Sequence, residues 1–441
     1  MTTHDGGVEG ASPTTGKGQD PEARAGARTG ARTGAGADDE AVGSSVLAMA
    51  RDLAPETVVL RRELHTWPEV GLDLPGTQRR VLAALDGLGL HISTGHRLSS
   101  VRATLTGATE GPTILLRADM DALPLTEDTG RDFASRTPGV MHACGHDAHT
   151  AMLVGAARLL AKRRAELSGR VVFMFQPGEE GDHGARHMID EGVLKGVDAA
   201  FALHVTPNLP SGTLHLRPGT QMAASDRVQV TVQGRGGHAS APHTTCDPVP
   251  VACEIVLALQ TTLTRMVAAD DAAVLSITRL TAGTAHGIIP DTAQLAGTLR
   301  TLKPTTRERL LTALHRVADG VAAAHGAKAD VRIDTGYPVT VNDPAFTDLV
   351  LRTAADVLGR RSVDVLPAPP MTAEDFSYVL GTVPGALAFL GACPPGLTPE
   401  GAPSLHSSRA DFDEAALTAG IACHAAVALA YTSTSHAERP R

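Results

Sequence analysis

The loop MHACGHDAH, residues 141–149, holds three histidines, one cysteine and one aspartate within nine positions. Cys144 and His146 flank a single glycine, so a tight bend at Gly145 would aim a thiolate and an imidazole at the same ion. Both groups are good donors to divalent metal ions. A solvated histidine-rich loop is the alternative explanation of this stretch on its own. The metal interpretation therefore depends on further ligands and a base elsewhere in the chain.

Carboxylates follow two apolar runs of strand length. The run TILLRADM, residues 113–120, leads to Asp121, and the run VVFMF, residues 171–175, leads to the adjacent pair Glu179 and Glu180. A carboxylate at the end of a buried strand is costly unless it is paired, and a metal site supplies such a partner. Neighbouring side chains on an extended segment point in opposite directions, so one glutamate can bind metal while the other acts as a general base. An ordinary strand-end turn is the alternative at Asp121.

His204 lies at the end of a third apolar strand, predicted over residues 199–205. Such a histidine is more often a hydrogen-bonded core residue, but here it is the third strand in succession to end in ligand-type chemistry. Alternation of strands and helices predicts an α/β fold with a mixed, largely parallel sheet flanked by helices. In such sheets the carboxyl ends of the strands carry the site.

Helical periodicity and capping signals predict the helices around this sheet. A break at Pro55 and a helix start capped by Thr77 are expected. The predicted helices cover residues 47–64, 77–88, 150–167, 185–191, 344–358 and a closing segment that ends near 431, and a further apolar strand covers 385–390.

The region 226–335 has a different rhythm, because its strands alternate polar and apolar residues. The order strand, helix, strand, strand, helix, strand predicts an inserted α+β ferredoxin-like domain. The predicted elements cover residues 227–233, 250–266, 274–280, 293–302, 305–325 and 330–334. The predicted division is a disordered tail (1–44), a main domain in two parts (45–225 and 338–432), the inserted domain (226–337) and a second tail (433–441).

Composition excludes several function classes. The 441 residues carry 39 basic and 48 acidic side chains, a formal charge of −9, and no basic stripe that would favour nucleic acid as a partner. No run of about 18 uninterrupted apolar residues predicts a membrane span. The N-terminal tail lacks the hydrophobic core of a secretory signal. Five scattered cysteines show no disulfide spacing, which favours a reducing cytoplasm.

Taken together, these stretches resemble the hippurate hydrolase and aminoacylase group of dinuclear-metal amidohydrolases. That group includes the plant auxin-conjugate hydrolases and is related to carboxypeptidase G and the dipeptidases. The resemblance runs in order over about residues 50–432. It rests on RADMDALP (117–124), MHACGHDAHTAML (141–153), FQPGEEG (175–181), FALHV (201–205), GRGGHASAPH (234–243), IIPD (288–291), GTLRT (297–301), TAEDFSY (372–378) and LHS (405–407).

The resemblance implies roles for individual residues and two divalent ions, zinc, manganese, cobalt or nickel. Glu179 would be the catalytic base, and Asp121 would lie just behind the metal ligands. The resemblance implies that residues 45–225 and 338–432 form the catalytic domain and that the inserted domain, residues 226–337, is a lid and dimerisation domain. His238 on this lid would reach the substrate carbonyl, in relatives from the partner subunit of a homodimer formed through the lid domains. Arg300 would bind a substrate carboxylate. The implied metal ligands are Cys144, His146, Glu180, His204 and His406.

The activity that the resemblance implies is hydrolysis of an N-acyl amino acid to a carboxylic acid and an amino acid. A dipeptidase or carboxypeptidase on the same scaffold is one alternative, and a catalytically degenerate metal-binding member is another. Relatives usually carry Asn where this chain has Gly287, so the amide that helps to hold substrate is missing, although the preceding His286 is placed to substitute in part.

The other histidines and cysteines are assigned structural roles. Three histidines are expected to support the site rather than bind metal. Four cysteines are expected to be ordinary thiols. These residues are His142, His149, His183, Cys246, Cys253, Cys393 and Cys423.

Overall fold

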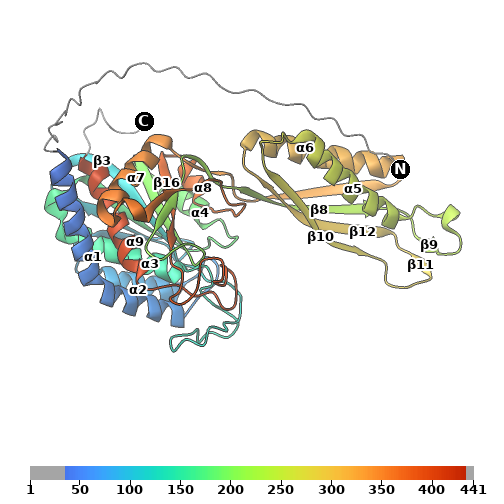
Figure 1. Ribbon diagram of the computed structural model, residues 1–441. Coiled ribbons are helices and arrows are strands. Elements are labelled where there is room, and N and C mark those ends of the chain that lie inside the picture. Colours follow the sequence, from blue (N-terminus) through green and yellow to red (C-terminus); the bar gives the residue numbers. More distant parts are fainter. Residues whose placement is uncertain (1–34, 434–441) are drawn as a thin grey trace, which may run out of the picture.

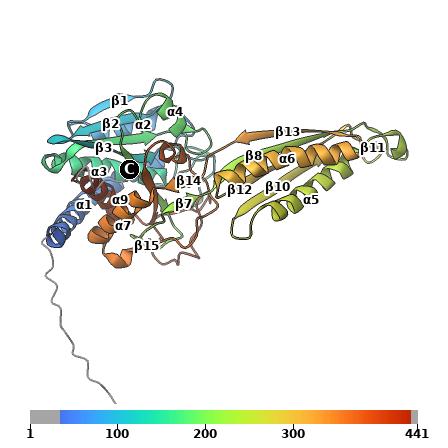
Figure 2. The ribbon, with the colours of Figure 1, turned by 90° about the horizontal axis from the view of Figure 1, so that it is seen from above.

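Two separate β-sheets organise the chain (Figure 1). The structure is a computed structural model that describes residues 35–433, with side chains from residue 43 onward. Within these residues, eight strands form one sheet and four form another. Seen from above, the smaller sheet and its helices α5 and α6 extend away from the larger body (Figure 2).

The larger sheet is parallel at its centre, antiparallel where β1, β2 and β4 pair and where β16 pairs with β6, and parallel again between β6 and the edge strand β15. The order is β1-β2-β4-β3-β5-β16-β6-β15, and β4, β3, β5 and β16 pair in parallel. This confirms the predicted mixed, largely parallel sheet. Its strands are β1 (His91–Thr94), β2 (Val101–Thr106), β3 (Thr109–Asp119), β4 (Ser168–Gln176), β5 (Ala199–Thr206), β6 (Leu214–Leu216), β15 (Val363–Val365) and β16 (Gly385–Gly391).

Helices cover both faces of this sheet because its central strands are apolar on both sides. On β3, Ile114 and Leu116 contribute to one core cluster while Leu115 contributes to another, as alternating side chains require. The first cluster lies beneath α1 (Ala35–Thr66), α3 (His146–Lys162), α7 (Pro344–Leu358) and α9 (Ala416–Ser433). The second lies beneath α4 (Gly184–Asp190) and α8 (Ser377–Leu380), and α2 (Pro75–Leu85) packs beside α3.

Three local expectations about the helices are wrong. α1 runs through Pro55 without a break, because its apolar face packs against α3 and α9 and this tertiary packing outweighs the lost backbone hydrogen bond. Thr77 is not the cap of α2, since the Glu69 carboxylate accepts hydrogen bonds from the N–H of Thr77 (2.7 Å) and of Gly76 (3.0 Å). α3 begins four residues before the predicted position.

The predicted tails fall largely outside the described residues. The structure describes nothing of residues 1–34 or 434–441, and residues 35–44 of the predicted tail belong to α1.

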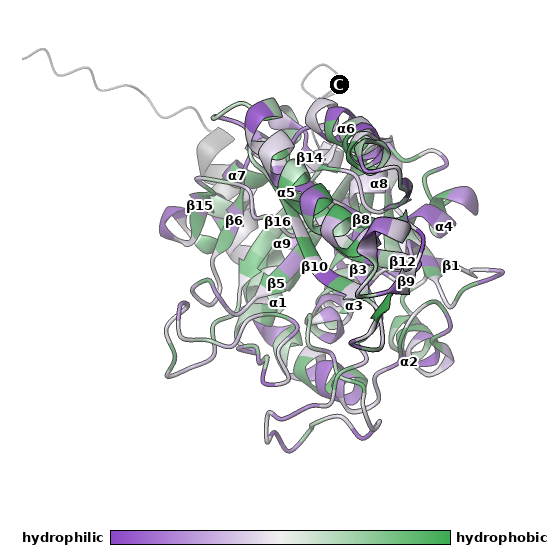
Figure 3. Ribbon diagram, turned by 90° about the vertical axis from the view of Figure 1, so that its right-hand side faces the viewer, coloured by the Kyte–Doolittle hydropathy of each residue, from purple (hydrophilic) through white to green (hydrophobic). Residues whose placement is uncertain are grey.

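The smaller sheet has the predicted ferredoxin-like order of elements, and we call it and its two helices the lid. Neighbouring strands all pair antiparallel in the order β10-β12-β8-β13. Helices α5 and α2 show both purple and green segments, as expected for surface helices with one apolar face (Figure 3). The lid elements are β8 (Ala224–Gln233), α5 (Pro248–Met266), β10 (Ala273–Ala282), β12 (Thr292–Thr301), α6 (Pro304–Ala324) and β13 (Lys328–Thr335).

Two small strand pairs lie at opposite ends of the lid. β9 (Gly237–His238) pairs with β11 (Ile288–Ile289) at the end far from the larger body (Figure 1). β7 (Gly219–Met222) pairs with β14 (Thr340–Asn342) where the lid joins that body.

α9 is long and apolar enough by composition to cross a membrane, but 83% of it is buried inside the fold. It packs against α1, α3 and α7 beneath the larger sheet. Its composition therefore fits the core helix of a folded domain.

Candidate active site

The predicted metal ligands gather at the carboxyl edge of the four central parallel strands. Glu179 and Glu180 follow β4, and His204 lies near the end of β5. His406 lies in the loop that follows β16, and Cys144 lies just before α3, which follows β3. Parallel strands bring residues that are far apart in the sequence to one edge, which is where α/β folds place their sites.

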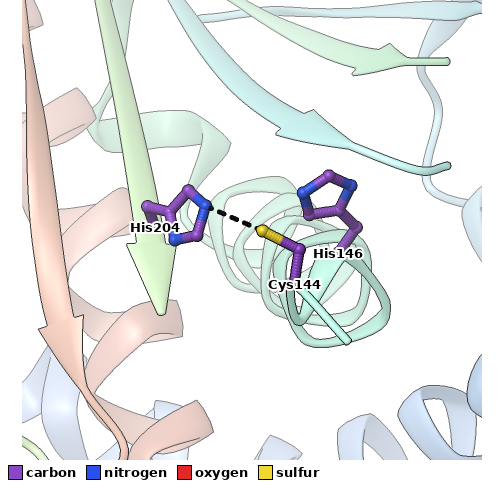
Figure 4. A group of neighbouring side chains, drawn as sticks. All are labelled: Cys144, His146 and His204. Atoms are coloured by element: carbon purple, nitrogen blue, oxygen red, sulfur yellow. Dashed lines mark hydrogen bonds between the residues drawn. The ribbon is translucent and has the colours of Figure 1, made fainter. Parts of the chain in front are cut away.

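Gly145 makes the bend between Cys144 and His146. Its φ of +82° is left-handed, and a Cβ there would lie 2.4 Å from a methyl carbon of Val205, so only glycine fits. The bend brings Cys144 Sγ and the His146 ring toward His204 of β5 (Figure 4). Their ligand atoms all lie within 4.8 Å of one another, with Cys144 Sγ 3.4 Å from His204 Nε2.

A second group of donors shares Cys144. His406 Nε2 lies 3.3 Å from Cys144 Sγ and 3.1 Å from Glu180 Oε1. The backbone of His406 has φ +62°, which is rare for a residue with a side chain, and its N–H donates to the carbonyl of Ala143 (3.0 Å). All five predicted ligands thus meet around Cys144 in two overlapping groups.

The ring of His146 is buried without a well-formed hydrogen bond. Neither of its nitrogens has a hydrogen-bond partner among the described residues, and carboxylate oxygens of Asp119 and Asp121 lie 3.4 and 3.5 Å from them. Burial raises the pKa of the Cys144 thiol well above its usual value, and Glu180 and Glu179 raise it further. A divalent cation would satisfy the unpaired atoms and stabilise the thiolate. The sulfur, nitrogen and oxygen donors therefore fit two divalent ions, one at each group.

His204 is held in a form that can bind a metal ion through its Nε2 atom. Its Nδ1 donates to its neighbour's carbonyl, Val205 O (2.7 Å), which leaves Nε2 facing Cys144. Burial, with His149 adding to it, lowers the pKa of His204 well below its usual value, so the ring is neutral. A neutral imidazole fixed through its other nitrogen is the usual form of a metal-binding histidine.

The three histidines expected to be structural have other surroundings. Both nitrogens of His149 are used, because Nε2 accepts the N–H of Val205 (2.8 Å) and Nδ1 lies 2.5 Å from a carboxylate oxygen of Asp119. Burial lowers the pKa of His142 to about 3, and its ring lies against that of His65. His183 contacts the hydroxyl of a tyrosine (3.0 Å).

Asp121 supports the turn that carries both glutamates. Its two carboxylate oxygens accept the N–H of Glu179 (2.9 Å) and of Glu180 (3.0 Å). Burial raises the pKa of Glu179 well above its usual value, and the nearby Glu374 and Glu180 raise it further. A buried carboxylate with a raised pKa is suited to accept and hold a proton.

A buried arginine pairs with carboxylates behind Glu179. Arg117 contacts Asp119 (2.7 Å), Glu374 (2.9 Å) and Asp375 (2.9 Å), and all four side chains are buried. Its Nε also donates to a side-chain oxygen of Gln176 (2.9 Å). The arginine offsets part of the negative charge that surrounds the candidate base.

A cavity of about 430 Å³ opens onto these donors where the lid joins the larger body. Arg300 lines it from β12, and in the described part of the chain no carboxylate lies within ion-pair distance of its guanidinium. Met222, Phe389 and Leu405 supply apolar surface. The cavity therefore offers a cation for a substrate anion and apolar walls beside the donor cluster.

Comparison with known proteins identifies the family. The model of Peptidase family M20/M25/M40 matches residues 115–430. N-acetylcysteine deacetylase of Bacillus subtilis is 39% identical over 360 residues, which cover 81% of this chain and 92% of that protein. The chain belongs to peptidase family M20/M25/M40. IAA-amino acid hydrolase ILR1-like 4 of Arabidopsis thaliana is 35% identical over 389 residues, covering 87% and 88% of the two chains.

The solved structures agree with this assignment. The Bacillus subtilis YXEP protein, described as a dinuclear metal-binding peptidase of the M20 family, superposes with a TM-score of 0.75 at 35% identity. The match covers 87% of this chain and all of that one. This M20 member is accordingly a metal-dependent amidohydrolase, as the sequence predicted.

His238 is the predicted site residue that the fold keeps apart from the others. It lies in β9 at the far end of the lid, exposed and distant from the donor cluster of its own chain (Figures 1 and 2). Its Nδ1 accepts hydrogen bonds from Ser240 (N–H, 3.1 Å). Cys144, His146, Glu179, Glu180, His204 and His406 lie together, and Arg300 lines the same cavity as most of them.

Sequence reasoning did not assign roles to the buried ion cluster. The signal was present at Arg117, because a charged residue inside an apolar strand is almost never buried without a partner. Its partners Glu374 and Asp375 lie more than 250 residues further along the chain, so no local pattern links them. Asp119 contacts both Arg117 and His149 and so joins the end of β3 to this cluster.

Proposed function

We propose that this M20 enzyme hydrolyses the amide bond of N-acyl amino acids, releasing a carboxylic acid and a free amino acid. The observation that carries this proposal is the position of Glu179 beside the five-donor cluster, in a cavity that also presents Arg300. Relatives named as an N-acetylcysteine deacetylase and an IAA-amino acid hydrolase support the same substrate class.

Each residue would have a defined task. Cys144, His146, Glu180, His204 and His406 would hold two divalent ions, which when bound would supply Lewis-acid chemistry toward water and the scissile carbonyl. Glu179 accepts the proton of the attacking water and delivers it to the leaving nitrogen as the C–N bond breaks. Arg300 binds the carboxylate of the amino acid. The apolar walls receive the acyl group.

We further propose that the enzyme is a homodimer whose subunits contact each other through the lid, residues 226–337. In each chain the lid is inserted between the two segments of the catalytic domain, residues 45–225 and 338–432. His238 lies too far from its own cluster to serve it, so it would reach the substrate carbonyl of the partner subunit and stabilise the oxyanion. Exposed apolar side chains on the lid, among them Leu257 and Ile288, supply surface for such contact. Free cysteines, which are unpaired throughout the described residues, support a location in a reducing cytoplasm.

The test is a hydrolysis screen of the purified protein after chelation and reconstitution with zinc, manganese, cobalt or nickel. N-acetyl, N-benzoyl and longer N-acyl amino acids are compared with dipeptides and with peptides cleaved from the carboxyl end. Turnover of N-acyl amino acids with reconstituted metal is expected. A clear preference for dipeptides or peptides would assign the enzyme to the dipeptidase or carboxypeptidase alternative instead. A lack of turnover on every substrate would favour a degenerate member.

Glu179→Gln provides the matched variant for this screen. It should bind the same amount of metal as the wild type, because Glu179 is not among the five proposed ligands. Its turnover should fall by about 10²- to 10⁴-fold, the usual contribution of a general base. Wild-type turnover in Glu179→Gln would contradict the assigned base, and loss of metal would place Glu179 among the ligands.

A further inference from the structure

Tyr337 lies at the junction between the lid and the larger body. Two connections cross this junction, one where β7 leads into β8 and one where β13 leads into β14, and Tyr337 is in the second. Its carbonyl accepts the N–H of Ser225 (3.0 Å) on the first. The two connections are therefore hydrogen-bonded to each other at this residue.

The hydroxyl of Tyr337 reaches the turn that carries the two glutamates. It donates to the carbonyl of Glu179 and accepts the N–H of Gly181 (2.8 Å). Asp121 holds the other side of the same turn through the N–H groups of Glu179 and Glu180. Four backbone groups of the turn are thus fixed by two side chains, one from the larger body and one from the junction.

Tyr337 is itself held firmly by its neighbours. Its ring packs edge-on against His183, with centroids 5.0 Å apart. The preceding Gly336 approaches β8 so closely that a Cβ there would lie 2.1 Å from Ser225 O. Arg307 of α6 donates to the carbonyl of Gly336 (3.3 Å) and pairs with the Asp226 carboxylate. The position of the hydroxyl is therefore set by the lid through Gly336 and by the larger body through His183.

We propose that Tyr337 is a positioning residue that fixes the Glu179–Gly181 turn relative to the lid. The inference rests on the proposed function, because it assigns Glu179 and Glu180 the tasks given above. A hydroxyl that bridges both ends of a short turn limits how the side chains between them can move. Since the same residue belongs to the lid junction, a change in lid orientation is transmitted to the base and to a metal ligand.

Tyr337→Phe tests this role, because it removes the hydroxyl and keeps the ring. With the metal-loaded enzyme, kcat should fall about 10- to 100-fold, the scale expected when a catalytic group is displaced by a fraction of an ångström to an ångström. KM and metal content should change little, since the cavity walls and the ligands remain. The peptide that contains residues 179–181 should exchange its amide hydrogens faster, because Gly181 N–H loses one of its two acceptors and keeps only the carbonyl of Glu179 (2.7 Å), which is itself no longer held by the tyrosine.

Tyr378→Phe is the matched control. The hydroxyl of Tyr378 lies in the same junction, 3.0 Å from His183 Nδ1 and 3.4 Å from the carbonyl of Gly336, and among the described residues it makes no hydrogen bond to the Glu179–Gly181 turn. We expect kcat within about twofold of wild type and unchanged exchange of residues 179–181.

Three results would overturn the inference. They are wild-type kcat and exchange in Tyr337→Phe, equal losses in Tyr337→Phe and Tyr378→Phe, and loss of metal from Tyr337→Phe. The amide-exchange comparison needs no substrate. If the wild type hydrolyses no N-acyl amino acid, the proposed function fails, and faster exchange in Tyr337→Phe alone still supports the restraint on the turn.

Discussion

Replacing Arg117 by methionine should destabilise the protein strongly and in a pH-dependent way. The guanidinium contacts Asp119, Glu374 and Asp375 at 2.7–2.9 Å, and all of these side chains are fully buried. Methionine fills similar space but leaves three carboxylates without their cation. Removing one partner of a buried ion pair costs about 3–5 kcal/mol, and we expect the upper part of that range because three partners are lost together.

The direction of the pH effect follows from Arg117, which lowers the pKa values of Asp119 and Asp375, although burial still holds that of Asp375 above its usual value. In the wild type, burial opposes ionisation of Asp119, but Arg117 and His146 outweigh it and hold its pKa well below the usual value. The stability from ionised Asp119 is therefore present above pH about 4 and lost as the pH falls through the folded pKa. In Arg117→Met the arginine no longer opposes the effect of burial, so the pKa values of the carboxyl groups that it contacted rise. The stability of the variant is then lost as the pH rises.

Denaturant unfolding of the chelated proteins between pH 4 and pH 7 measures both effects. The difference in unfolding free energy between wild type and Arg117→Met should widen from pH 4 to pH 7. Arg80→Met is the control, because Arg80 pairs with Glu63 at the partly exposed surface (3.0 Å), where a salt bridge contributes about 0–1 kcal/mol. A difference below about 1 kcal/mol for Arg117→Met, or one that narrows with rising pH, would refute the reasoning.

Two further predictions concern the lid. If His238 acts across the dimer, His238→Ala and Glu179→Gln should each be nearly inactive with full metal content, while subunit exchange between them should restore about a quarter of wild-type activity, measured as initial rate. No recovery would contradict the role in the partner site. Gly287→Asn should fit without strain, since a Cβ there meets nothing within 4 Å, and should raise kcat/KM by about 2- to 10-fold through one added hydrogen bond. An unchanged kcat/KM would show that the missing amide does not limit this enzyme.

Much of the fold could be predicted because hydrophobic patterns report burial directly. The predicted strand 199–205 is observed as Ala199–Thr206, and the alternating region 226–335 folds as the expected ferredoxin-like lid. The errors lie where tertiary contacts override local signals. Pro55 lies within a helix that packing sustains, and Glu69 takes the capping role expected of Thr77.

The candidate site divides in the same way. Cys144 and His146 could be found because metal-binding residue types are concentrated in one loop, and Glu180 because it follows an apolar strand. Arg117 and Tyr337 could not be assigned, since their partners lie 257 and 158 positions away and only the folded sheets bring them together. Sequence patterns thus reveal groups that do chemistry more readily than groups that position them.

The charge balance of the cluster explains why both kinds of group are needed. Among the described residues, six buried or mostly buried carboxylates, the candidate base included, lie close together, and Arg117 pairs with three of them. These carboxylates belong to Asp119, Asp121, Glu179, Glu180, Glu374 and Asp375. Divalent cations held by the two donor groups that share Cys144 would offset the remaining negative charge. They would also lower the raised pKa of Glu179 toward the value that a base requires. Metal binding would therefore tune the base as well as activate water, and this explains why a glutamate with raised pKa lies directly beside the ligands.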